Sequence, residues 1–180
     1  MIRRAIDAGV NYVDTAYPYH GGNSEVVVGK ALANGYRQQV KLATKMPVWL
    51  AKEASDFDRL FDEQLRRLQT DQINCYLLHG MGRERWKRAP PGYPGMGRAP
   101  YKGGADPVAR VFISRRVFRE EIVDSWDRWT FCMIFYNYAS ECVQAGTRGL
   151  HYANAKGLAV VVMEPLMGGN LVNRPARCWK

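Results

Sequence analysis

The chain has 180 residues, 47% of them hydrophobic and 24% charged, which is typical of one globular domain or of part of a larger one. No apolar run approaches the roughly 20 residues of a membrane-spanning helix, residues 1–7 lack the apolar centre of a secretory signal, and the four cysteines show no CxxC pair and no regular spacing. The composition argues against a membrane span, a disulfide framework and a zinc site, and it favours a cytoplasmic protein with a net charge of +9.

The first 81 residues alternate between helical and strand patterns. The expected elements are a helix at 2–8, a strand at 11–16, a helix that opens at 23–25 and ends at 34–35, a strand at 40–46, a helix at 55–68 and a strand at 73–79. Ser55 is expected to cap the helix that it begins. The strands end near residues 14, 45 and 79, so each step contains one helix and has the length of a βαβ unit.

Residues 82–119 interrupt this alternation and hold most of the net charge. They contain ten Lys or Arg residues and two acidic residues, so the remainder of the chain is nearly neutral. Five of the chain's nine prolines lie between residues 88 and 107 and rule out a regular helix there. A reading-frame change in the gene and an inserted loop are two explanations of this segment. Its basic and aromatic side chains also suggest anion binding, but no nucleic-acid motif is present and we expect no nucleic-acid partner.

The alternation resumes after this segment. The expected elements are a helix at 116–126, a strand at 129–138, a helix at 144–156 and a strand at 158–164. The last strand is apolar along nearly its whole length, which is typical of burial on both faces. The pattern predicts an α/β fold with a parallel sheet, either open and doubly wound or closed as a barrel. The expected parts are βα units at 1–81, an atypical segment at 82–115, further βα units at 116–173 and a tail at 174–180.

Four polar residues stand where the predicted strands end. Asp14 ends the first strand, Tyr19 follows five residues later, and Lys45 and His79 end the next two strands. Because the carboxyl ends of parallel strands share one edge, we expect these side chains to form one site. Taken singly, each has a simpler explanation as a turn former, a solvated lysine or a packed histidine. Their joint placement favours catalysis.

These side chains suit the reduction of a carbonyl group. A hydride added to the carbonyl carbon leaves negative charge on the oxygen, so a proton donor must stand beside it. A free phenol, with a pKa near 10, donates poorly, and a neighbouring ammonium group makes the transfer easier. In this scheme Tyr19 donates the proton, Lys45 assists it, Asp14 holds Lys45, and His79 orients the substrate oxygen.

The same residues carry a resemblance to the aldo-keto reductase family, over about residues 2–80 and 116–173. The matching motifs are Asn11-Tyr-Val-Asp-Thr-Ala with Tyr19, Gly21-Gly-Asn-Ser-Glu25, Gly29-Lys-Ala-Leu32, Leu42-Ala-Thr-Lys45, Tyr76-Leu-Leu-His79, Gln144-Ala-Gly-Thr-Arg-Gly-Leu150 and Val162-Met-Glu-Pro-Leu166. The resemblance implies a partial TIM (β/α)8 barrel that lacks the first strand and the C-terminal part. It also implies NADPH as cofactor, no metal, and the four residues above as the catalytic tetrad.

The resemblance assigns further roles. Tyr19 is selected over its rival Tyr17 by the five-residue spacing from the aspartate, while Tyr17 and Trp49 are expected to line the substrate pocket, with core packing as the alternative. Met133 departs from the family pattern, because a thioether replaces a glutamine that usually contacts the nicotinamide. The positions that match cofactor contacts are Ser114, Asn137, Glu164, Pro165, Leu166, Gly168 and Gly169.

The closest likeness is to the bacterial branch that often carries a ferredoxin-like iron–sulfur tail. Cys178 alone cannot hold a 4Fe-4S cluster, which needs four thiolates, so a cluster is expected only in a full-length relative.

The expected function is NADPH-dependent reduction of a small aldehyde or ketone, by a truncated and impaired copy of such an enzyme. Five or six strands cannot close an eight-stranded barrel, so we expect the isolated chain to be poorly soluble and to show no NADPH turnover. The alternatives are a non-catalytic remnant, a subunit completed by another chain, and anion or nucleic-acid binding through residues 82–119. The sequence leaves open the particular carbonyl substrate, the choice between NADPH and NADH, and the oligomeric state.

Overall fold

The computed structural model describes residues 1–87, 109–114, 120–125, 127 and 129–173. Most of the basic segment and the tail at 174–180 lie outside the described residues, and the two explanations of that segment stay predictions.

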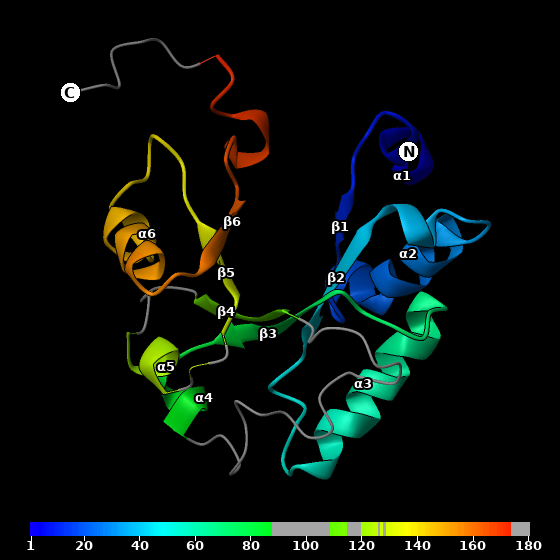
Figure 1. Ribbon diagram of the computed structural model, residues 1–180, viewed down its shortest axis with the longest axis horizontal. Helices are drawn as coiled ribbons and strands as arrows, with labels where there is room; N and C mark the ends of the chain where they lie inside the picture. The colour runs from blue at the N-terminus through cyan, green and yellow to red at the C-terminus, as the bar shows by residue number, and fades with distance from the viewer. Residues whose placement is uncertain (88–108, 115–119, 126, 128, 174–180) are drawn as a thin grey trace.

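One parallel sheet of six strands organises the described residues. Its strands are β1 (Tyr12–Asp14), β2 (Lys41–Met46), β3 (Cys75–Met81), β4 (Ala109–Ser114), β5 (Phe131–Phe135) and β6 (Ala159–Met163). Each strand pairs in parallel with the next along the chain, and the strands form an arc with the helices on its outer side (Figure 1). Because a doubly wound sheet reverses its strand order, this sequential order identifies a partial TIM (β/α)8 barrel and confirms the expected fold class.

The helices fill the connections between the strands. They are α1 (Ile2–Asp7), α2 (Ser24–Leu32), α3 (Ser55–Leu68), α4 (Arg83–Lys87), α5 (Glu120–Asp124) and α6 (Gly146–Ala155). The bounds of α3 are those predicted, and α1 ends just before Gly9, whose φ of +100° lies in the region that favours glycine. Both α4 and β4 fall within residues 82–115, so the atypical segment contributes elements to the fold.

The capping of α3 differs from the sequence-based expectation. Ser55 does not cap the helix: Ala54 is the N-cap residue, and no side-chain cap bond is formed there. Instead, the Asp56 carboxylate accepts hydrogen bonds from the backbone N–H groups of Lys52 (2.8 Å) and Glu53 (3.2 Å). This carboxylate in the first helical turn binds the backbone that leads into the helix, and the helix dipole favours its negative charge at this end.

The burial of β6 also differs from the expectation. Ala159 is exposed and the side chain of Val162 is 39% exposed, so the prediction that this strand is buried on both faces is wrong. The reason is topological, because among the described residues β6 is an edge strand and pairs with β5 alone. In β5, by contrast, Cys132 and Met133 point to opposite faces and are both buried.

Apolar residues cover both faces of the sheet. The outer face and its helices share a large cluster that includes Leu42, Met46, Leu60, Leu68 and Leu78. The inner face has a smaller cluster of Ala43, Leu77, Phe131 and Met133. Since alternate residues of a strand share a face, Lys45 lies on the inner face two residues beyond Ala43, and His79 two residues beyond Leu77. The fold thereby places both side chains at the carboxyl edge of the inner face.

Candidate active site

The carboxyl ends of the first three strands bring the four predicted residues together. Asp14 is the last residue of β1, Lys45 lies near the end of β2 and His79 lies in the second half of β3. Tyr19 begins the short 3-10 turn Tyr19–Gly22 that follows β1.

Lys45 occupies the centre of this group. Its side chain is 1% exposed, and its ammonium group donates hydrogen bonds to the Asp14 carboxylate and to the backbone oxygen of Thr15 (2.8 Å). A buried charge needs such a partner to offset its loss of hydration. Burial raises the pKa of Asp14 above its ordinary value, although the charge of Lys45 acts in the opposite direction.

Tyr19 lies between the ammonium group and the histidine. The centroid of its ring is 4.8 Å from Lys45 Nζ, and its ring meets that of His79 edge to face, with 5.7 Å between centroids and an interplanar angle of 88°. The side chain is 37% exposed. The arrangement therefore offers solvent or a ligand a phenol that is in contact with a buried cation.

Of the two predicted substrate-pocket residues, Trp49 lies against the site and Tyr17 lies against α3. The ring of Trp49 is 5.3 Å from that of His79, and Trp49 is 40% exposed. The guanidinium of Arg85 lies 5.7 Å from the Trp49 ring and donates to the backbone oxygen of Gly80 at 2.8 Å. The Tyr17 hydroxyl instead donates to a carboxylate of α3, that of Glu63, at 2.9 Å.

The predicted cofactor residues lie at the same carboxyl edge, on later strands. Ser114 is the last residue of β4, and its side chain is outside the described residues. Asn137 follows β5 and is 5% exposed; its amide donates to the backbone oxygen of Glu164 (3.1 Å) and accepts from the N–H of Ala139 (3.1 Å). Met133 is buried in the inner apolar cluster. The Asn137 amide therefore connects the loop after β5 to the loop after β6 through its hydrogen bond to Glu164.

The loop after β6 contains the remaining predicted cofactor residues. Glu164 (φ +57°), Gly168 (φ +65°) and Gly169 (φ +97°) have left-handed backbone conformations, and Pro165, Leu166 and both glycines are exposed. A Cβ atom added at either glycine would meet nothing within 4 Å. The loop thus presents an open, glycine-containing backbone at the carboxyl edge.

Sequence reasoning missed a polar group behind the site. Gln64, which is fully buried, donates to the backbone oxygen of Lys45 (3.1 Å) and to the carboxylate of Glu25 (2.6 Å). A signal was present, because Gln64 is four residues from both Leu60 and Leu68 and so occupies a polar position on the apolar face of the predicted helix.

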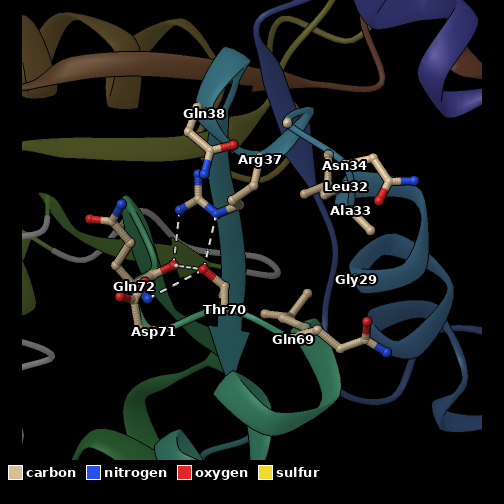
Figure 2. A pocket seen from close by; sticks show the side chains of 12 residues that line it. Gly29, Leu32, Ala33, Asn34, Arg37, Gln38, Gln69, Thr70, Asp71 and Gln72 are labelled. Carbon is tan, nitrogen blue, oxygen red and sulfur yellow. Dashed lines mark hydrogen bonds between the residues drawn. The ribbon is translucent and has the colours of Figure 1, made fainter.

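The amino edge of the sheet contains a different polar feature. A depression of about 500 Å³ lies between the C-terminal ends of α2 and α3 (Figure 2). Its central side chain is Arg37, whose guanidinium donates to the oxygens of Val40 (3.1 Å), Thr70 (3.2 Å), Gln72 (2.9 Å) and Asn74 (2.8 Å). This depression is at the end of the strands opposite to Lys45.

Neither a metal-binding cluster nor a membrane-spanning helix is present among the described residues. No group of three or more His, Cys, Asp or Glu side chains within them is arranged to hold a metal ion. No helix within them is long and apolar enough to cross a membrane.

Comparisons with known proteins point to one family. Residues 1–85 match the sequence model of the Aldo/keto reductase family. Methylglyoxal reductase YeaE of Escherichia coli (strain K12) is 40% identical over 81 residues, which cover 45% of this chain and 28% of that protein. The NADH-specific methylglyoxal reductase of the same organism is 34% identical over 107 residues, covering 50% of this chain and 31% of that protein.

Solved structures share the fold. The crystal structure of an aldo-keto reductase from Klebsiella pneumoniae in complex with NADPH matches with a TM-score of 0.71 and 26% sequence identity. The match covers 96% of this chain and 59% of that one. The chain therefore spans less than two thirds of the length of each of these relatives.

Proposed function

The chain is a member of the aldo-keto reductase family, and from this premise we propose that it reduces small aldehydes or ketones with hydride from a nicotinamide cofactor at the carboxyl edge of its sheet. The observation that carries the proposal is the environment of Lys45. Its buried ammonium pairs with Asp14 and lies 4.8 Å from the ring centroid of the half-exposed Tyr19. A cation held beside an accessible phenol is the arrangement that proton transfer to a developing oxyanion requires.

In the proposed reaction each side chain has one task. Hydride adds to the carbonyl carbon, the electrons of the C=O π bond move to oxygen, and Tyr19 transfers its hydroxyl proton to that oxygen to give the alcohol. Lys45 stabilises the phenolate that remains, and Asp14 keeps the ammonium in place. His79, whose ring packs edge to face on that of Tyr19, orients the substrate oxygen.

The residues at this edge fit a nicotinamide cofactor. The tetrad supplies a proton and charge stabilisation but no electron pair, so the reduction needs a bound hydride donor, which the reduced nicotinamide supplies. We assign its phosphate side to the open backbone of the loop from Glu164 to Gly169. In this assignment Asn137 acts by fixing that loop, because its amide is already bonded to backbone groups. Ser114 remains a proposed contact of the nicotinamide.

Methylglyoxal is the first substrate to test, and NADPH is the proposed cofactor. Two similar proteins are named methylglyoxal reductases, one of them NADH-specific, while a similar structure contains NADPH. NADPH and NADH therefore have to be compared directly. The free cysteines among the described residues, Cys75, Cys132 and Cys142, support the proposed cytoplasmic location.

We further propose that the 180-residue chain is impaired. The arc has two edge strands, β1 and β6, and Val162 on β6 is partly exposed. Unpaired strand edges favour aggregation and leave the barrel open to water. Both effects lower turnover without removing the tetrad.

The test is cofactor oxidation by the purified chain with methylglyoxal, followed by the fluorescence of the reduced nicotinamide, with NADPH and NADH in parallel. We expect no measurable steady-state rate, but aldehyde-dependent oxidation when the chain is in molar excess over NADPH. A robust steady-state rate would contradict the proposed impairment. No oxidation even in excess protein, in a mixture where a full-length relative is active, would show that the chain is a non-catalytic remnant.

A further inference from the structure

The loop that carries Tyr19 contains a non-glycine residue in the left-handed region of the backbone. His20, Gly21 and Gly22 have φ values of +52°, +62° and +88°, and the first is a non-glycine residue in the left-handed region. Only the conformation of His20 is strained, because glycine adopts a positive φ without cost. A contact from another element would stabilise the loop in this conformation.

Arg67 of α3 supplies that contact. One terminal nitrogen of its guanidinium donates to the backbone oxygen of Gly22 and lies 3.4 Å from that of Tyr17, so it contacts both ends of the loop. Its Cζ atom lies 4.3 Å from the centroid of the Tyr17 ring. Tyr19 lies between these two attachment points along the chain.

A buried carboxylate holds this guanidinium in place. Glu25 is fully buried, and its Oε2 lies 3.2 Å from Arg67 Nε. Its other oxygen accepts hydrogen bonds from Thr44 Oγ1 (2.6 Å) and Gln64 Nε2 (2.6 Å). Burial raises the pKa of Glu25, and the hydrogen bonds and Arg67 act against that rise. Three partners hold the buried Glu25 carboxylate in place, and this carboxylate in turn fixes the position of the Arg67 guanidinium.

The same group also touches the strand that carries Lys45. Gln64 Nε2 donates to the backbone oxygen of Lys45 at 3.1 Å. Thr44, which donates to Glu25, directly precedes Lys45 in β2. The Glu25 carboxylate is therefore connected to both parts of the site. Its ion pair with Arg67 leads to the loop that carries Tyr19, and its hydrogen bonds with Thr44 and Gln64 lead to the strand that carries Lys45.

We infer that Arg67, paired with the buried Glu25, is a positioning residue that holds the Tyr19 loop against Lys45. The inference rests on the proposed role of Tyr19 as proton donor, and it adds residues outside the tetrad to the catalytic arrangement. Arg67 does not touch the reacting atoms and acts only through the loop.

The test compares Arg67→Met with Arg59→Met. Arg59 is on the same helix, is largely exposed and pairs with Asp56, so its loss controls for removing one positive charge from α3. The readout is hydrogen exchange of the amides of Tyr19 and Asn23, which donate within the loop. We expect Arg67→Met to speed this exchange about tenfold, and Arg59→Met to leave it unchanged. Equal exchange in all three proteins would overturn the inference.

A second readout reports on the Tyr19 ring. In protein labelled with 3-fluorotyrosine, the Tyr19 fluorine signal, assigned with Tyr19→Phe, should move in Arg67→Met toward its position in the urea-unfolded chain. The Tyr17 signal should move as well, because Arg67 contacts that ring, but the remaining tyrosine signals should stay in place, which a general loss of structure would not allow. If Arg67→Met does not fold, Arg67→Lys, which keeps the charge and loses the planar fork, should give a smaller shift in the same direction.

Neither readout needs turnover, so the two proposals can fail separately. The positioning role alone would be contradicted by two results together: carbonyl reduction depends on Tyr19, and the Arg67 variants leave the hydrogen exchange and the fluorine signals unchanged. The proposed function alone would be contradicted if the Arg67 variants loosen the loop but Tyr19→Phe reduces methylglyoxal as fast as the unmodified chain does.

Discussion

Among the described residues, each edge of the sheet holds a basic side chain bonded to several oxygens, the buried Lys45 at one edge and the half-buried Arg37 at the other. At the carboxyl edge, Lys45 donates to the Asp14 carboxylate and to one backbone oxygen, and its ammonium faces the accessible ring of Tyr19. At the amino edge, Arg37 donates to the Thr70 hydroxyl and to the backbone oxygen of Gln72 (Figure 2), and also to the oxygens of Val40 and Asn74. Both cations are compensated, but only Lys45 forms an ion pair with a carboxylate and lies beside a group with a transferable proton, whereas Asp71 acts on Arg37 through its charge alone.

The difference separates a reacting site from a structural one. Arg37 connects the segments before β2 and β3, and a guanidinium has a fixed charge across the physiological range. Lys45 and Asp14 instead form an ion pair beside the ring of Tyr19, whose hydroxyl is the proposed proton donor. A cation that is bonded to several protein oxygens is therefore not by itself a sign of catalysis in this chain.

The largest expected effect is that of removing the ammonium group. Lys45→Met should lower the single-turnover rate of methylglyoxal reduction by about 10²–10⁴-fold, the range that positioned acid–base groups contribute. The measurement is NADPH oxidation with protein in excess, with near-ultraviolet circular dichroism as a check on folding. A folded Lys45→Met variant with an unchanged rate would contradict the claim that the carboxyl edge is the reacting site.

At the amino edge the expected effect is on stability. Arg37→Met should lower the free energy of unfolding by about 2 kcal/mol, because charge-assisted hydrogen bonds are lost and several oxygens lose their donor. The single-turnover rate per folded molecule should not change. Urea unfolding checks the first part, with Gln38→Met, an exposed residue on the rim of the same depression, as the matched control. A loss of rate without a loss of stability would place Arg37 in the reacting site.

The smallest expected effect is a difference in pH dependence. Burial raises the pKa of Asp14 above 3.8, so the folded chain holds this proton more tightly than the unfolded chain does. The stability that this proton contributes is complete below pH 3.8 and is lost as the pH rises through the raised value. The free energy of unfolding of the unmodified chain should therefore fall relative to that of Asp14→Asn as the pH rises through this window.

The amino edge should behave differently in the same experiment. The difference between the unmodified chain and Arg37→Gln should stay constant across that window, because arginine does not titrate there. If the difference in the free energy of unfolding changed with pH in the same way for Asp14→Asn and for Arg37→Gln, the electrostatic contrast between the two edges would be contradicted.

The sequence predicted the strand ends well because βαβ units have a regular length. Asp14, Lys45 and His79 could be placed at one edge from the positions of three short apolar strands. Tyr19 could be added from its spacing to Asp14. The bounds of α3 were also predictable, since its apolar spacing is regular over four turns.

Other features depend on partners that a single segment does not reveal. The apolar sequence of β6 reads as a buried strand, and only the strand order shows that it is an edge. Tyr17 and Trp49 are both aromatic loop residues, yet one packs on α3 and the other on His79. The pairing of Glu25 with Arg67 joins residues that are 42 positions apart, and nothing in either local pattern indicates it.

The most direct test of the account is the transfer of deuterium from 4-deuterated NADPH to methylglyoxal, measured by mass spectrometry of the alcohol product with protein in excess. The account predicts deuterated product from the unmodified chain and about 10²-fold less from a folded Tyr19→Phe variant. Equal yields of deuterated product from the two proteins would contradict the claim that the carboxyl edge reduces carbonyl groups with Tyr19 as proton donor.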